Sequence, residues 1–209
     1  MPLRNRVTPL GDIVAEPGRG LVYGNRGCLH DRQGAVVRGY NGKRWIACRL
    51  EFRGRRRSPL VQPGRYTGLF FLDDATALAA GHRPCAECRR EDHRRLVEVW
   101  RAVHPDDRGT DAIDARLHDE RLAFPARAKR THAAPIDALP DGAFVRLATG
   151  PHLVLGTRLL RWSSGGYTSS RPRPPRGPAE VLTPPSLLRL LGAGFDPLVP
   201  LIHPSAHGA

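Results

Sequence analysis

Residues 70–90 read FFLDDATALAAGHRPCAECRR, the densest run of interpretable chemistry in the chain. Asp73 or Asp74 can cap a helix whose body, residues 75–80, consists mostly of good helix formers. Gly81 is typical of the position that ends a helix. Cys85 and Cys88 form a C-x-x-C pair, the minimum knuckle for two thiolate ligands. The stretch therefore predicts a short Ala-rich helix that leads directly into half of a metal site.

The charge of the whole chain is strongly positive. Its 209 residues include 33 Lys and Arg against 20 Asp and Glu, a formal net charge of +13, and only Lys43 and Lys129 are lysines. One interpretation is a phosphate-binding surface, because Arg pairs bidentately with phosphate. The other is a compositional bias that replaces Lys with Arg. Since such a bias does not explain the net excess of positive charge, the composition favours a nucleic-acid partner.

Cysteine usage and hydropathy indicate the cellular compartment in which the protein is expected. The sequence shows neither a basic start followed by an apolar run nor an apolar stretch of about 18 residues. We therefore expect no signal peptide, no membrane partner and a cytoplasmic location. In a reducing cytosol, four cysteines that include a C-x-x-C pair indicate a metal site rather than two disulfides.

Upstream of the knuckle the pattern predicts a β-hairpin. Residues 35–39 and 44–52 resemble paired strands, and Asn-Gly in the turn Tyr40–Lys43 suits a type I′ bend. Alternation along the second strand puts Cys48 on its apolar face. Downstream, helices are expected over residues 87–103 and 111–123. The expected fold class is α+β, with small zinc-stabilised antiparallel β-hairpins and packed helices.

The C-terminal part is expected to form a separate unit. A Pro/Asp-rich connection begins at Pro135, which divides the chain into a zinc-binding α+β domain, 1–134, and a small β-rich segment, 135–209. Within that segment we expect strands over residues 143–148 and 153–162. A Pro/Arg-rich loop follows at 171–178. A short helix then begins with Pro184 and Pro185.

Tetrahedral zinc requires four nitrogen or sulfur ligands. Cys85 and Cys88 supply two, and Cys48 is the third candidate because it points inward on a nearby strand. The fourth stays open: Cys28 would make an all-thiolate site, and His30 would make a site of three thiolates and one imidazole. A further candidate is His82, which could instead support a ligand by hydrogen bonding. A metal-free protein with buried thiols is the alternative, but the pattern favours Zn²⁺.

A basic cluster follows the Cys48 strand directly, beginning at Arg53 and ending at Arg57. It can be a solvated turn or a phosphate clamp at the end of a strand, and its position near the cysteines favours the clamp. A second basic group comes just after the knuckle. The expected phosphate contacts are Arg53, Arg55, Arg56, Arg57, Arg89 and Arg90.

The run Ala80-Gly81-His82-Arg83-Pro84-Cys85-x-x-Cys88, with Phe71 and the Ala-rich helix before it, resembles the zinc-binding module of Ada-type DNA methylphosphotriester repair proteins. It also resembles Ada-like zinc modules appended to some nucleases. The resemblance implies a zinc-stabilised, DNA-associated module with Cys85 and Cys88 as ligands. In the Ada module two further cysteines lie close together and one accepts a methyl group, whereas Cys28 and Cys48 are twenty residues apart. Cys48, followed by the basic cluster, is the candidate acceptor if methyl transfer occurs.

These observations lead to one predicted function and two alternatives. The prediction is a structural-zinc nucleic-acid-binding protein, directed at DNA. The first alternative is an enzyme that acts on nucleic acid, either an Ada-like methyl acceptor or a nuclease. The second is a zinc-stabilised interaction protein whose positive charge is compositional and which has no nucleic-acid partner.

Overall fold

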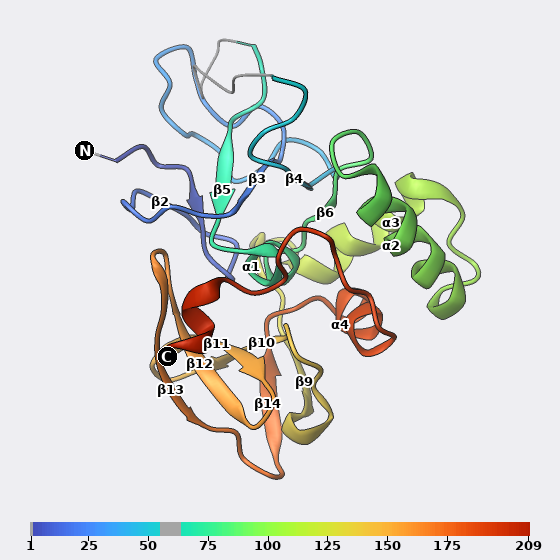
Figure 1. Cartoon of the computed structure of the whole chain (residues 1–209). Coiled ribbons are helices and arrows are strands. Elements are labelled where there is room, and N and C mark those ends of the chain that lie inside the picture. The colour runs from blue at the N-terminus through green and yellow to red at the C-terminus, as the bar shows by residue number, and fades with distance from the viewer. Residues whose placement is uncertain (1, 55–63) are drawn as a thin grey trace.

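The computed structural model describes residues 2–54 and 64–209, and within these ranges it shows a mixed α+β fold. Two six-stranded sheets lie on either side of a short central helix, α1 (Asp74–Ala79), as Figure 1 shows. The first sheet has the order β2-β1-β5-β3-β4-β6. Its strands are β1 (Arg6–Val7), β2 (Ile13–Val14), β3 (Val22–Asn25), β4 (Ile46–Cys48), β5 (Leu69–Phe71) and β6 (Arg83–Pro84).

The second sheet is entirely antiparallel and has the order β13-β12-β11-β10-β14-β9. It contains β9 (His132–Pro135), β10 (Phe144–Leu147), β11 (Gly150–Leu155), β12 (Arg158–Ser163), β13 (Gly166–Pro172) and β14 (Pro178–Val181). A small hairpin of β7 (Leu122–Ala123) and β8 (Ala128–Lys129) precedes it. The helices α2 (Arg90–Val103), α3 (Gly109–Arg121) and α4 (Pro185–Gly192) pack together beside both sheets (Figure 1). None of the helices in the described ranges is long and apolar enough to cross a bilayer.

The structure confirms the short helix predicted in the opening stretch. The Asp73 carboxylate accepts a hydrogen bond from the Thr76 backbone N–H at 2.8 Å, which caps α1. Gly81 follows the helix with a φ of +87°, a conformation that glycine adopts without a steric penalty. Every residue of α1 is buried. Small side chains allow the elements on every side of α1 to pack closely against it.

Three cores meet around α1. Ala77 belongs to the cluster on the first sheet, Ala75 to the cluster on the second sheet, and Leu78 to the cluster formed with the other helices. The capping carboxylate of Asp73 also accepts hydrogen bonds from the Tyr167 hydroxyl at 2.7 Å and the His203 backbone N–H at 2.9 Å. Segments far downstream therefore attach to the same helix that leads into the cysteines.

The predicted hairpin of residues 35–39 and 44–52 is wrong. β4 pairs instead with β3, with Tyr23 opposite Cys48, and in parallel with β6. The earlier segment forms no named strand, and Val36 makes only an isolated bridge to His30. β4 lies inside the sheet with a neighbour on each side, so long-range pairing overrides the local turn signal.

The C-terminal region is richer in strands than expected. The single strand predicted over 153–162 is two strands, β11 and β12, joined through a turn at Gly156. The short helix predicted after the prolines is present as α4, with Pro185 in its first turn. The boundary expected between residues 134 and 135 falls within β9. The Pro/Arg-rich segment is tied down in part, because Arg173 donates hydrogen bonds to the carbonyls of Ile136 and Leu139.

Candidate metal centre

The structure brings Cys48, Cys85 and Cys88 together. Their sulfur atoms all lie within 4.8 Å of one another, and all three residues are buried. The backbone explains the convergence. β6 pairs in parallel with β4, and the Cys85 N–H donates to the Ala47 carbonyl at 2.8 Å. This ladder places the first knuckle cysteine beside the last residue of β4, although 37 residues separate them in sequence.

Hydrogen bonding within the group favours a thiolate at Cys85. The pKa of Cys85 is lowered, first by the thiols of Cys48 and Cys88 and then by backbone hydrogen bonds from Cys88 and Glu87, against the opposing effect of burial. The pKa of Cys48 is raised, because it shares protons with the other two thiols and is buried. Three sulfurs this close therefore compete for protons that a divalent cation would displace.

An apolar wall surrounds the sulfurs. Tyr23 belongs to the same buried cluster, and Ile46, Phe52 and Phe70 pack against it. The rings of Tyr23 and Phe70 meet edge to face with their centroids 5.4 Å apart. Such walls limit the access of water, which protects metal–thiolate bonds and fixes the ligands in place.

The donor set fits zinc. Three thiolates suit a borderline-soft metal such as Zn²⁺, and backbone N–H groups directed at a sulfur are the outer contacts that such ligands use. In the ranges 2–54 and 64–209 the compact group contains three residues, and none of the candidates for a fourth ligand belongs to it. Residues 1 and 55–63 contain no Cys, His, Asp or Glu in the sequence, so they offer no common zinc ligand.

The candidate fourth ligands have other partners. The Cys28 thiol lies 3.7 Å from the His30 carbonyl oxygen, and His30 Nδ1 lies 2.7 Å from the Thr67 hydroxyl. His82 accepts a hydrogen bond from Arg26 Nε at 3.1 Å. The structure therefore groups three of the predicted ligands and leaves Cys28, His30 and His82 outside.

The predicted phosphate contacts divide into three cases. Arg89 is 1% exposed and binds Asp74 and Asp92 through its whole guanidinium, so the expectation that it contacts phosphate is wrong. Arg53 and Arg90 are exposed and remain available. The other three, Arg55, Arg56 and Arg57, lie outside the described residues.

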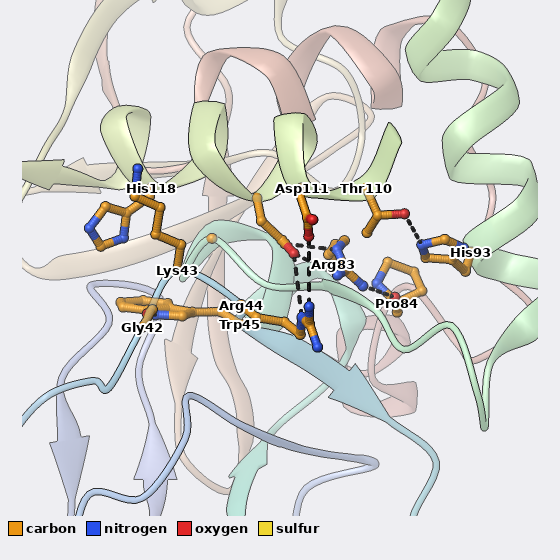
Figure 2. Close-up of polar contacts among 12 residues, drawn as sticks. Gly42, Lys43, Arg44, Trp45, Arg83, Pro84, His93, Thr110, Asp111 and His118 are labelled. Atoms are coloured by element: carbon orange, nitrogen blue, oxygen red, sulfur yellow. Dashed lines mark hydrogen bonds and ion pairs between the residues drawn. The ribbon is translucent and has the colours of Figure 1, made fainter. Parts of the chain in front are cut away.

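Behind the knuckle, β6 is fixed to α3 by charged side chains. Arg83 donates to both carboxylate oxygens of Asp114 at 2.9 and 2.8 Å, and both side chains are buried. Arg44 approaches the same helix at Asp111 and Asp114 from the segment below it, as Figure 2 shows. This contact fixes the residue two positions before Cys85, and therefore the direction in which the knuckle leaves the strand.

No family model matches the chain, and comparisons with curated proteins and with solved structures also give no match. None of these comparisons bears on the resemblance to the Ada-type module, which stays a prediction from the sequence. The structure gives the two knuckle cysteines a third sulfur from β4. Any function must be inferred from the arrangement of the side chains themselves.

Proposed function

We propose that the chain is a nucleic-acid-binding protein, directed at DNA, whose first sheet is stabilised by a structural zinc ion. The convergence of Cys48, Cys85 and Cys88 carries this proposal. The ion would join β4 to the knuckle and so fix the start of α2. A structural ion suits the site because the three cysteines are only 4–8% exposed.

The surface of α2 supports a phosphate-bearing partner. The helix begins two residues after Cys88, and the exposed Arg90, Arg94 and Arg101 follow one another at spacings that share a helix face. Arg side chains in a row can neutralise successive phosphates along a strand. The zinc ion would thus hold the helix that presents these arginines.

Metal content tests the first half of the proposal. Elemental analysis of the purified chain should find about one zinc per protein, and Cys85→Ser or Cys48→Ser should lose it. Cys28→Ser is the matched control, because its sulfur lies outside the group, and it should retain the metal. A Cys48→Ser variant with full zinc content, or a Cys28→Ser variant without zinc, would contradict the assigned ligands.

Salt-dependent binding tests the second half. Anisotropy of a labelled DNA duplex should report binding that weakens as salt rises, and removing two phosphate contacts should reduce the slope by about 1.8. The variant is Arg94→Gln with Arg101→Gln, and the matched control is the exposed Arg161→Gln on β12. If the duplex does not bind even at low salt, the alternative is the better account: a zinc-stabilised interaction protein that has no nucleic-acid partner.

An enzyme that acts on nucleic acid is the second candidate. Zinc with three protein ligands and one open position is typical of catalytic sites, and the described residues group three sulfurs. In an Ada-like reaction a thiolate would accept the methyl group of a methylphosphotriester, with Cys48 as the candidate. The burial of Cys48 favours the structural role instead. Mass spectrometry after incubation with methylated DNA separates the two, since an added methyl group on any cysteine would establish the enzyme.

A further inference from the structure

A cavity of about 500 Å³ lies on the other side of the first sheet from the sulfurs. Side chains alternate along an extended chain, so Trp45, just before β4, lines the cavity, whereas Cys48, three residues later, faces the metal group. The volume lies in the range of small-molecule sites. Its basic lining residues are Arg4, Arg26, Arg38, Arg121, Arg127 and Lys129. Among the described residues that line it, Asp12 is the one carboxylate.

Two of these cations are buried without a carboxylate partner. Arg26 is 2% exposed and donates to the Gly11 carbonyl at 2.8 Å and to His82 Nε2 at 3.1 Å. Arg121 is 1% exposed and donates to the carbonyls of Gly81 and Lys43 at 2.9 and 2.6 Å. Arg26 Nη2 and Arg121 Nε are buried and have no hydrogen-bond acceptor among the described residues. Each side chain therefore retains donor capacity.

Trp45 contacts both guanidinium groups. The central carbon of Arg26 lies 3.9 Å from the centre of the indole, and that of Arg121 lies 3.8 Å from it. The indole itself donates to the Gly42 carbonyl and packs against His82. Cation–π contact stabilises each of these charges, but it does not neutralise them.

A third cation adds to the same charge. The Lys129 ammonium donates to the Ala79 carbonyl at the end of α1. Burial and the nearby Arg26, Arg121 and Arg146 lower the pKa of Lys129 to about 7. Burial lowers the pKa of Arg26 and of Arg121 to about 9, with Asp12 acting in the opposite direction on Arg26 and Asp114 on Arg121. Buried charges without counter-charges are costly, so this group of cations is suited to an anion.

We propose that this cavity binds a phosphate monoester, with Arg26, Arg121 and Lys129 around the phosphate oxygen atoms. Three cations that line one cavity suit a phosphate dianion better than they suit a singly charged carboxylate, and guanidinium groups bind phosphate oxygens in pairs. Tyr40, which also lines the cavity, offers an aromatic surface for the organic part of the ligand. The proposal goes beyond the zinc-stabilised function and does not depend on the metal.

The phosphate can come from a free nucleotide or from the end of a nucleic-acid strand. Calorimetry on the full chain should use inorganic phosphate, adenosine 5′-monophosphate, and a short single-stranded oligonucleotide with and without a 5′-phosphate. Tighter binding of the 5′-phosphorylated strand identifies a strand end as the source. Tighter binding of the mononucleotide, with equal binding of the two strands, identifies a free nucleotide.

The decisive variant is Lys129→Met, which removes one charge from the group and keeps an unbranched side chain one atom shorter. Phosphate affinity should fall roughly tenfold to a hundredfold, as expected for the loss of a hydrogen bond to a charged group. Arg161→Gln, at an exposed position on β12 that does not line the cavity, is the matched control and should bind phosphate as the parent chain does. The melting temperature of each variant shows that it remains folded.

The proposal is overturned if no phosphate probe binds the parent chain at millimolar concentration. It is equally overturned if folded Lys129→Met binds inorganic phosphate as tightly as the parent does. Should Lys129→Met fail to fold, two further variants, Lys129→Gln and Tyr40→Ala, test the site. The first removes the charge, and the second removes only the aromatic surface, so Tyr40→Ala should weaken the mononucleotide more than inorganic phosphate.

Discussion

The molecule buries arginine in two different ways. Arg89 lies between α1 and α2 and binds Asp74 at 2.6 and 2.8 Å and Asp92 at 2.8 Å. Arg26 and Arg121 are buried to a similar degree, but their partners are backbone carbonyls, histidines and the indole of Trp45. One environment balances the charge within the fold, and the other leaves it facing a cavity.

The pKa directions reflect this difference. Burial lowers the pKa of Arg89, but the carboxylates of Asp74 and Asp92 raise it by more, so that it ends above its ordinary value. For Arg26 and Arg121 burial dominates, and the pKa falls to about 9 in each case. A buried arginine with carboxylates is complete as a structural element, whereas one without them retains attraction for an anion.

The largest expected effect is at Arg89. Arg89→Met should lower the free energy of unfolding by about 3–5 kcal/mol, because it leaves Asp74 and Asp92 buried without their cation. Urea denaturation measures the change. The neighbouring Arg90→Met is the control, and as an exposed position it should stay within about 0.5 kcal/mol. Similar losses in the two variants would show that the Arg89 network contributes little.

Arg121→Met should cost less. It leaves the Gly81 and Lys43 carbonyls without a donor, a loss of about 1–3 kcal/mol, but it strands no carboxylate. It also removes repulsion between two neighbouring guanidinium groups. The same urea experiment checks the order. A loss equal to that of Arg89→Met would mean that both arginines have the same structural role and that the comparison is wrong.

Phosphate should stabilise the chain through the cavity. At ten times its dissociation constant, phosphate should add about 1.4 kcal/mol to the free energy of unfolding, because it binds only the folded state. Thermal unfolding in phosphate and in chloride of equal ionic strength measures the difference. The exposed control Arg161→Gln should retain the increment, and Lys129→Met should lose most of it. Equal increments in both would place the anion elsewhere.

The smallest expected effect is a pH dependence. Sulfate keeps its charge between about pH 6 and pH 9, so a change in its affinity reports on the protein. Lys129 faces Arg26, Arg121 and Arg146 and has its pKa lowered to about 7, while Asp12 and Arg127 also line the cavity. Protonated Lys129 attracts the anion, so affinity should be highest below pH 7 and fall as pH rises through it. Lys129→Met should show a flatter profile, and an unchanged profile would contradict this role for Lys129.

Local sequence patterns predicted the parts of the fold that depend on near neighbours. Asp73 caps α1 and Gly81 follows it as expected, because capping and a left-handed turn involve residues only a few positions apart. The inward position of Cys48 was also predicted from alternation along a strand. Its strand partner was not, since β4 pairs with β3 and β6 across long loops.

The buried charges could not be predicted in the same way. Arg89 looked like a surface cation because it belongs to a basic run, and its partner Asp74 is fifteen residues away. The cavity joins Arg26, Arg121 and Lys129, which no sequence motif connects. Asp114, His118 and Arg121 follow one another at helical spacing on α3. In the structure all three are buried, and Asp114 binds Arg83 while His118 accepts from Arg121.

The sequence alone determined a capped, Ala-rich helix that is followed by Gly81 and leads into the C-x-x-C pair. Tertiary structure decided what each side of that stretch contacts. Parallel pairing of β6 with β4 brings Cys85 to Cys48, whereas His82 and the Gly81 carbonyl turn to the buried arginines of the cavity. Caps and knuckles follow from local geometry, but a charge is balanced or left unbalanced only when distant segments pack against it.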